Sequence, residues 1–287
     1  LEHGELTVEL TPERLAVAQA SGWLEGDASP LLLQADRLGW RRWLQAMEQV
    51  VAELVERAHA PVPKPVKAVD LELSDRLNAE QCAAVRALDQ ASVVLLSGGP
   101  GTGKTSTVVE ILARAEARHP GLRIGLAAPT GKAARRLGEA VMAQRAPLPC
   151  STLHRWLEAG SRGFGRHRQR PLELDLLVID EMSMLDLALT QALLEALPSG
   201  CRLLLVGDPA QLPPVGSGAV WHRLQQPDVR GRFGAGAVHL ERTYRNRGAL
   251  AQVAQQLRQG DLTAFGAALA ALPEQANLQV HPSPLRR

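Results

Sequence analysis

The chain has 287 residues, of which 45% are hydrophobic and 22% are charged, and its 32 basic residues nearly balance 30 acidic ones. This composition supports a folded core in one large domain or two ordinary ones, and it excludes a largely disordered chain. The net charge of +2 does not by itself indicate a nucleic-acid partner, so any basic binding surface must be local.

The cysteines and the apolar runs indicate in which cellular compartment the protein works. Cys82, Cys150 and Cys201 lie far apart and form no CxxC pair, which argues against a metal site or a disulfide framework and favours a reducing cytoplasm. No apolar run approaches the roughly 18 residues of a membrane span, and residues 1–20 lack a signal-peptide core. We therefore expect a cytoplasmic protein with no membrane partner. The chain begins with Leu1, which favours a piece of a larger protein.

Residues 31–59 carry apolar side chains near helical spacing, with charged residues between them, and this pattern predicts a helical module. Trp40 and Trp43 fit a base-stacking pair or a stripe that faces a core or a partner, and the stripe is the commoner explanation of this spacing. Three prolines then break the helix and form a stiff linker, at Pro61, Pro63 and Pro65. We therefore assign residues 1–66 to the end of a helical N-terminal domain and its linker.

The helical pattern that starts near Leu77 begins with Asn78, and Gln81 follows three residues later. This spacing predicts a capping box, in which the two side chains bond to each other's backbone amides. The amide of Gln81 also suits a hydrogen bond to adenine. The local pattern does not decide between the two roles.

Residues 92–107, SVVLLSGGPGTGKTST, hold the strongest indication of function. An apolar run predicts a buried strand, four glycines break it, and a helical pattern begins at Lys104. Gly98, four residues, and then Gly103-Lys104-Thr105 have the spacing of a phosphate-binding loop. Glycines let backbone amides approach phosphate oxygens, and the following helix points its positive end at them.

In such a loop the lysine reaches the β- and γ-phosphates of ATP, and the threonine hydroxyl ligates Mg²⁺. The alternative is an ordinary glycine-rich turn, which would not require strand, loop, Lys-Thr and helix in this order. The candidate nucleotide-binding residues of the loop are Gly98, Gly99, Pro100, Gly101, Thr102, Gly103, Lys104, Thr105 and Ser106.

The next predicted strand, Arg123–Ala128, leads into Thr130-Gly131-Lys132 at the start of a helix. Such a helix start can hold a nucleic-acid phosphate, or it can be an ordinary helix start with a solvated lysine. A further helix begins within residues 151–156, where His154 lacks a second metal ligand at suitable spacing. Residues 160–171 contain four arginines and three glycines, which predicts a mobile basic loop, solvated or in contact with a DNA backbone.

A fully apolar strand, Leu176–Ile179, ends in Asp180-Glu181. Paired carboxylates at a strand end are the expected partners of a phosphate loop, one for Mg²⁺ and one for the attacking water. Leu203–Val206 is likewise an apolar strand, followed by the polar stretch Gly207-Asp208-Pro209-Ala210-Gln211, in which Gln211 is placed to sense a γ-phosphate or the water beside it. The alternative for these residues is a polar loop at a strand end.

Ala237–Leu240 reads as a last short strand. Because parallel strands end at one edge of a sheet, we expect a single site there. Residues 67–241 are therefore predicted to be an α/β, P-loop nucleotide-hydrolysing domain with a mostly parallel sheet. Residues 242–287, with amphipathic helices over 249–271, would begin a further domain that is truncated.

Six motifs in order resemble superfamily 1 helicases, and most closely the RecD family, the alpha subunit of exodeoxyribonuclease V. They are GGPGTGKT (98–105), APTGKAA (128–134), STLHR (151–155), VIDEMSM (178–184), VGDPAQLPPV (206–215) and LERTYR (240–245). The resemblance implies a RecA-like fold with ATP and Mg²⁺ as cofactors. It assigns adenine contact to Gln81, and metal binding to Thr105 and Asp180.

The resemblance also assigns catalysis and DNA binding. The implied catalytic residues are Lys104, Asp180, Glu181, Gln211 and Arg245. Arg242 is the rival of Arg245 by position. The residues implied to lie along single-stranded DNA, where backbone contacts suit a motor that ignores sequence, are Thr130, Lys132, Thr152 and His154.

The function implied is an ATP-dependent DNA helicase or translocase subunit of 5′-to-3′ polarity. It would act on single strands from duplex ends, with RecB-like and RecC-like subunits, in double-strand break repair and recombination. The stretch after Arg245 is too short for the second motor domain of that family, and its two later motifs are not found. Two alternatives stay open: a stand-alone superfamily 1 helicase, and a nucleotide-regulated assembly module. No nuclease is expected, since no separate carboxylate cluster for two metals is present.

Overall fold

The computed structural model describes residues 5–26, 28–64, 66, 77–244, 253, 256 and 262–270. The chain divides into two compact units. The first consists of residues 1–99 and 103–241, and the second of residues 100–102 and 242–287. Within the second unit, α11 spans Leu262–Ala270, in the region where amphipathic helices are predicted.

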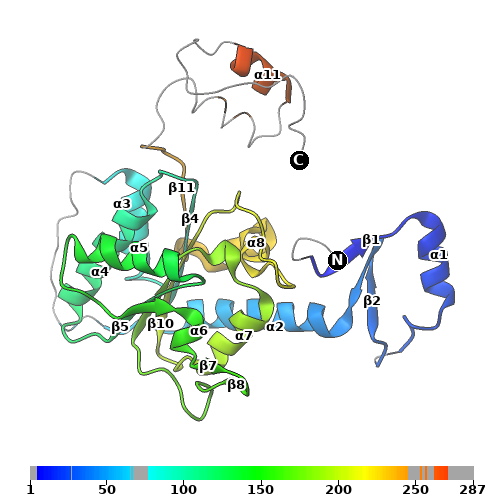
Figure 1. The fold of residues 1–287 in the computed structure, drawn as a ribbon, viewed down its shortest axis with the longest axis horizontal. Coiled ribbons are helices and arrows are strands. Elements are labelled where there is room, and N and C mark those ends of the chain that lie inside the picture. The colour runs from blue at the N-terminus through cyan, green and yellow to red at the C-terminus, as the bar shows by residue number, and fades with distance from the viewer. Residues whose placement is uncertain are drawn as a thin grey trace. The chain divides into compact units, whose positions relative to one another are not determined.

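A six-stranded parallel sheet forms the centre of the first unit (Figure 1). Its strands lie in the order β11 (Ala237–Leu240), β4 (Val93–Gly98), β10 (Arg202–Gly207), β9 (Leu176–Ile179), β5 (Ile124–Ala128) and β6 (Cys150–Thr152). All neighbouring pairs are parallel, which confirms the predicted α/β, P-loop fold. Because the strands are parallel, their carboxyl ends lie along one edge of the sheet.

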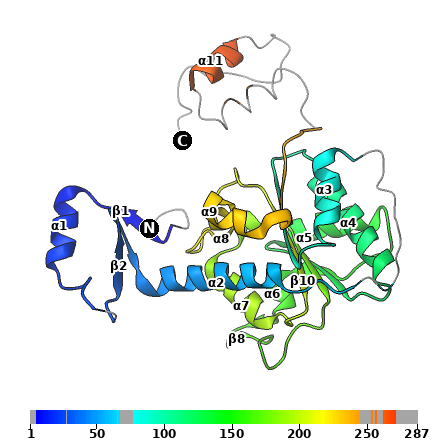
Figure 2. The same cartoon turned by 180° about the vertical axis from the view of Figure 1, so that it is seen from behind.

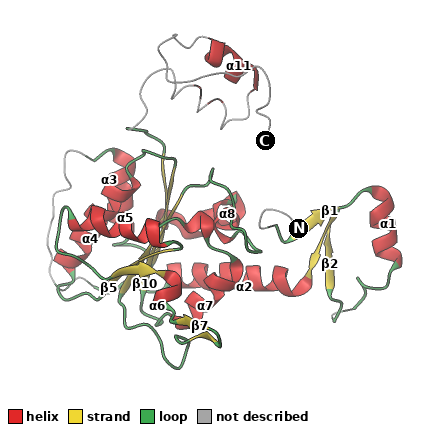
Figure 3. Ribbon diagram, viewed as in Figure 1, coloured by secondary structure: helices red, strands yellow, loops and turns green. Residues whose placement is uncertain are grey.

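Helices cover both faces of the sheet, as Figure 3 shows. Val94 and Leu96 of β4 belong to a core with α3 (Ala79–Ala87), α4 (Lys104–Arg118) and α5 (Gly131–Met142). Val93 and Leu95 belong to the opposite core, with α2 (Arg41–His59), α7 (Leu187–Ala196) and α8 (Val220–Gln225). Seen from behind, α2 and α8 lie on this second face (Figure 2). A strand with apolar side chains on both faces must be apolar throughout, which is why the central strands stand out in the sequence.

Shorter elements complete the first unit. They are the 3₁₀ turn η1 (Met182–Met184), α9 (Pro227–Arg230) and the 3₁₀ segment η2 (Gly231–Gly236). Among the residues that the structure describes, no helix is both long and apolar enough to span a bilayer.

The N-terminal segment differs from the prediction of continuous helix. A three-stranded antiparallel sheet, in the order β1–β3–β2, is built from β1 (Thr7–Glu9), β2 (Leu31–Gln34) and β3 (Arg37–Trp40), with α1 at Pro12–Ala20. The helix predicted over 31–59 therefore begins only at Arg41. A run such as Leu31–Gln34 suits a strand as well as a helix, and pairing with β3 and a left-handed Ala35 (φ 55°) make it a hairpin. Trp43 packs against the core, whereas Trp40 is 42% exposed.

The helix predicted to begin within residues 151–156 does begin there, at Leu153, whereas the basic segment differs from the predicted loop. Residues 150–152 form the edge strand β6, and the helix after it, α6 (Leu153–Trp156), has a single turn. The basic segment begins as a hairpin of β7 (Ala159–Gly160) and β8 (Gly163–Phe164) rather than as an irregular loop. Glu158 holds it, since its carboxylate pairs with Arg166 at 2.8 Å and with Arg170 at 2.6 Å.

Arg57 joins α2 to the end of α7. Its guanidinium donates hydrogen bonds to the carbonyl oxygens of Pro198 (3.0 Å), Leu194 (3.5 Å) and Leu197 (3.5 Å). We expect Arg57→Met to lower the free energy of unfolding by about 1–2 kcal/mol, because carbonyls at a helix end lose their donor. Urea unfolding measures the change. Glu56→Met, at an exposed neighbour in α2, should change it little, and equal effects would contradict the role of Arg57.

Candidate active site

The phosphate-loop sequence connects β4 to α4 at the carboxyl edge of the sheet. Gly101 (φ 76°) and Gly103 (φ 86°) are both left-handed, a conformation that only glycine adopts at little cost. Gly103 caps α4, which begins at Lys104, and its carbonyl accepts from the amide of Thr107. The loop and the positive end of a 15-residue helix therefore meet at one place, as an anion site requires.

Lys104 turns back over the loop. Its Nζ donates to the carbonyl oxygen of Gly98 at 2.6 Å and to that of Gly99 at 3.0 Å. The ammonium group is thus held at the loop itself, where it can pass to a phosphate oxygen with a small movement.

Gln81 forms the predicted capping box and also lies against the loop. Its Oε1 accepts from the amide of Asn78 at 3.0 Å, and its own amide donates to Asn78 Oδ1 at 2.8 Å. A Cβ atom placed on Gly103 would lie 2.6 Å from Gln81 Nε2. The cap is therefore confirmed, and the amide nitrogen of this buried side chain lies against Gly103 of the loop. Contact with adenine stays a prediction.

Gly103→Ala tests this packing. The new Cβ would collide with Gln81 Nε2, and alanine would have to adopt a φ of 86°. We expect nucleotide affinity to fall about tenfold or more, because the loop must shift. Titration with a fluorescent ATP analogue measures the loss. Gly121→Ala is the matched control, since Gly121 also has φ 86° but no atom within 4 Å of the added Cβ, and it should keep the affinity.

Two carboxylates follow β9 beside the phosphate loop. Asp180 is half-buried, and its Oδ1 accepts from the amide of Glu181 at 2.9 Å. Burial is the main cause that raises the pKa of Asp180 to about 6, and the negative charge of Glu181 raises it further. The hydrogen bond from the Glu181 amide and the charge of Lys104 lower it. A bound cation would favour the ionised form of the Asp180 carboxylate and so lower its pKa.

Glu181 has a left-handed backbone (φ 56°, ψ 43°) that is unusual for a residue with a side chain. The carbonyl of Glu181 accepts from the amide of Met184 at 3.0 Å, so the turn η1 holds this conformation. The described residues contain no cluster of three or more His, Cys, Asp or Glu side chains that could hold a metal. A hydroxyl and one carboxylate, from Thr105 and Asp180, suit Mg²⁺, which takes its remaining ligands from water and substrate phosphates.

Gln211 lies after β10, which pairs directly with both β4 and β9. Its Oε1 accepts from the hydroxyl of Ser183 at 2.9 Å, and Ser183 is fully buried. Ser183 is not a candidate by sequence alone, because a serine two residues after a carboxylate pair has no recognisable spacing. The register of β9 and β10 brings the two side chains together.

The four candidate DNA residues lie at two neighbouring helix starts. Thr130 caps α5 and Thr152 caps α6, since their hydroxyls accept from the amides of Ala133 (3.2 Å) and Arg155 (3.3 Å). Ala128 pairs with Thr152, so both starts lie at the carboxyl edge of the sheet. Lys132 and His154 are exposed. Both threonines therefore act as helix caps, and contact with DNA stays a prediction.

Arg245 lies outside the residues that the structure describes. The residue before it, Tyr244, donates its backbone amide to the carbonyl oxygen of Gly101 at 2.8 Å, within the second unit. Arg242 stacks on the Tyr244 ring, with 5.4 Å from its guanidinium carbon to the ring centre. The chain next to Arg245 is thus bonded to the phosphate loop.

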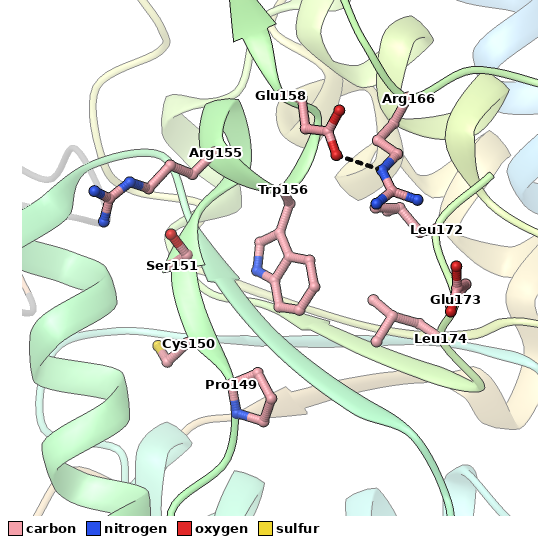
Figure 4. Close-up of a pocket in the computed structure, with 10 residues that line it drawn as sticks. All are labelled: Pro149, Cys150, Ser151, Arg155, Trp156, Glu158, Arg166, Leu172, Glu173 and Leu174. Atoms are coloured by element: carbon pink, nitrogen blue, oxygen red, sulfur yellow. Dashed lines mark hydrogen bonds and ion pairs between the residues drawn. The ribbon is translucent and has the colours of Figure 1, made fainter. Parts of the chain in front are cut away.

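A separate pocket of about 530 Å³ lies beside the edge strand β6 (Figure 4). Trp156 is central in it and donates its indole N–H to the carbonyl oxygen of Leu126 at 2.8 Å. Gly125 leaves room for this ring, since a Cβ there would lie 3.0 Å from it. None of the predicted site residues lines this pocket, so it is distinct from the phosphate loop.

Comparisons with known proteins agree with the motifs. A family model described as an AAA domain matches residues 81–217. The chain is 36% identical to a RecBCD enzyme subunit RecD from Mycolicibacterium smegmatis, over 96% of this chain and 52% of that protein. It is 41% identical to the ATP-dependent RecD2 DNA helicase of Deinococcus radiodurans, over 66% of this chain and 25% of that protein. The chain thus spans about half of the first relative and a quarter of the second.

Among solved structures, the chain resembles a Pif1 helicase described in a study of DNA unwinding at forked double-stranded DNA. The TM-score is 0.46 at 23% sequence identity, covering 68% of this chain and 50% of the other.

Proposed function

This chain is RecD-like and related to the superfamily 1 DNA helicases RecD and RecD2, and from that premise we propose that it is the ATP-hydrolysing domain of a DNA helicase or translocase subunit. The observation that carries the proposal is the meeting of three groups at one sheet edge. They are the ammonium of Lys104 at the loop, the half-buried carboxylate of Asp180, and the strained Glu181 beside it.

In the proposed reaction, the backbone N–H groups of residues 98–106, apart from Pro100, which has none, surround the phosphates of ATP. Lys104 passes from the loop carbonyls to the phosphates. Mg²⁺, when bound, would neutralise phosphate charge, and Thr105 and Asp180 would hold it. Glu181 orients the attacking water and accepts its proton. Gln211 donates to the γ-phosphate, and Arg245 adds positive charge in the transition state.

The adenine and DNA roles extend the same proposal. The amide nitrogen of Gln81 contacts the base, since it lies beside Gly103 of the loop. Single-stranded DNA runs along the exposed side chains of Lys132 and His154 and past the capping threonines, Thr130 and Thr152. Backbone contacts of this kind are independent of sequence, as translocation requires.

We further propose a role in a RecBCD-like complex in the cytoplasm, with RecB-like and RecC-like partners, 5′-to-3′ polarity and a part in double-strand break repair. The support is the similarity to the RecD subunits of two mycobacterial species over 90% or more of this chain. A stand-alone helicase is the second candidate, and the 41% identity to RecD2 favours it. Co-purification of the full-length natural protein with RecB-like and RecC-like subunits separates the two.

ATP hydrolysis by the full-length natural protein, measured against single-stranded DNA concentration, tests the motor function. We expect the rate to rise with DNA and then saturate, and duplex unwinding to require ATP. Hydrolysis that is indifferent to DNA would contradict a motor. Nucleotide binding without hydrolysis would favour the alternative of a nucleotide-regulated assembly module.

A further inference from the structure

The hydrogen bond between Ser183 and Gln211 joins the turn after β9 to the turn after β10. Ser183 lies in η1, two residues after Glu181 with its left-handed backbone, and its side chain is completely buried. Its Oγ lies 2.9 Å from Gln211 Oε1. One turn therefore supports the Glu181 backbone and contacts the Gln211 side chain.

The chemistry of this pair fixes which way the Gln211 amide points. The amide oxygen can only accept, so the single hydroxyl proton of Ser183 is donated to it. A flipped amide would donate to Ser183 Oγ instead, and the hydroxyl proton would then need another acceptor. None of the described residues is placed to accept it, and a fully buried hydroxyl cannot turn to water. The Gln211 Nε2 is therefore directed away from Ser183.

Little else holds the Gln211 side chain. The backbone N–H of Gln211 donates to the carbonyl oxygen of Asp208 at 3.4 Å. This bond holds the backbone turn but does not orient the side-chain amide. The next residue, Leu212, is 83% exposed, and Val215 is fully exposed, so neither of these two side chains packs against Gln211 as part of the core. Within the described part of the chain, Ser183 is the hydrogen-bond partner of the Gln211 side chain.

We propose that Ser183 is a positioning residue, which holds the Gln211 amide with its N–H groups toward the γ-phosphate and thereby lets the site distinguish ATP from ADP. This rests on the proposed function of the site as an ATPase. A donor facing the γ-phosphate favours ATP, whereas a carbonyl oxygen in that place would repel it. ADP lacks the γ-phosphate and is indifferent to the orientation.

Binding of Mg²⁺ complexes of ADP and of a non-hydrolysable ATP analogue, measured by calorimetry, tests the proposal. Ser183→Ala should weaken the analogue roughly three- to tenfold, the size expected for one hydrogen bond, and leave ADP unchanged. Gln211→Met should have a similar or larger selective effect. In the Gln211→Met background, Ser183→Ala should add nothing, because its effect passes through the amide. Equal losses for both nucleotides, or additive effects of the two changes, would overturn the proposal.

Thr190→Val is the matched control, since Thr190 is also buried and donates its hydroxyl to the carbonyl of Asp186, but it has no contact with Gln211. It should leave the ratio of the two affinities unchanged. Gln211→Glu reports independently of any packing change at Ser183, because a carboxylate oxygen facing the γ-phosphate should disfavour the analogue selectively. If the wild-type chain bound neither nucleotide, the proposed ATPase itself would fail. Binding of both nucleotides without a selective effect would reject only the role of Ser183.

Discussion

Lys104→Ala should weaken binding of Mg-ATP by about 10²- to 10⁴-fold and abolish DNA-stimulated hydrolysis in the full-length natural protein. The ammonium lies at the phosphate loop, 2.6 Å and 3.0 Å from two of its carbonyl oxygens. Charge-assisted hydrogen bonds contribute about 1.5–3 kcal/mol each, so the loss of two to phosphate gives this range. Calorimetric titration measures the affinity, and a phosphate-release assay measures hydrolysis.

Lys132→Ala is the matched control for this experiment. Lys132 is also a lysine in the first turn of a helix that follows a strand of the same sheet, but it is exposed and its proposed ligand is DNA. Its loss should reduce the affinity for single-stranded DNA and leave ATP affinity unchanged. A Lys104→Ala variant that still hydrolysed ATP in response to DNA would contradict the proposed site.

Asp180→Asn should stabilise the nucleotide-free protein while it removes Mg²⁺-dependent ATP binding. Asp180 has a pKa of about 6 in the folded protein, above the ordinary value of 3.8. Between these values the folded state binds more protons than the unfolded state, so the free energy of unfolding falls as pH rises from about 4 to about 6. Above pH 6 the full cost remains, about 2–3 kcal/mol. Asparagine avoids that cost and can still accept the amide of Glu181.

Urea unfolding at a series of pH values tests this sign. The wild-type protein should lose stability across the window from pH 4 to 6 relative to Asp180→Asn, and the difference should stay constant above it. Asp175, just before the other end of β9, is the contrast, since the hydrogen bond from Arg123 lowers the pKa of Asp175. Asp175→Asn should therefore destabilise the protein above pH 4. A less stable Asp180→Asn variant at pH 8 would show that the ionised carboxylate of Asp180 does not destabilise the folded protein.

Part of the fold can be predicted from the sequence, because buried strands of a parallel sheet appear as apolar runs. β9 has the bounds expected from its apolar run, and β4 and β10 differ from theirs by one or two residues. β6 was missed, because Cys150-Ser151-Thr152 has no apolar run, and only its pairing with β5 makes it a strand. The hairpin of β2 and β3 was missed for a similar reason, since its leucines fit two periodicities and distant pairing selects one.

In the candidate site, too, features set by local sequence are predictable and features set by distant contacts are not. The phosphate loop depends on glycines at fixed spacing within one stretch, so the sequence is enough to predict both the loop and the start of α4 at Lys104. The packing of Gln81 Nε2 against Gly103 joins residues 22 positions apart, which lies outside any local pattern. Ser183 and Gln211 are 28 residues apart, and only the pairing of β9 with β10 makes them neighbours.

The hydrogen bonds from Lys104 to its own loop make nucleotide entry an exchange of partners. In the proposed binding step, two hydrogen bonds of the ammonium pass from neutral carbonyl oxygens to charged phosphate oxygens. The driving force is therefore the difference between those two sets of oxygens, and it grows with the charge density of the incoming group. A weakly charged anion gains little by displacing the carbonyls, whereas a polyphosphate gains much. The resting loop thus acts as a threshold that favours nucleotide over the simple anions around it.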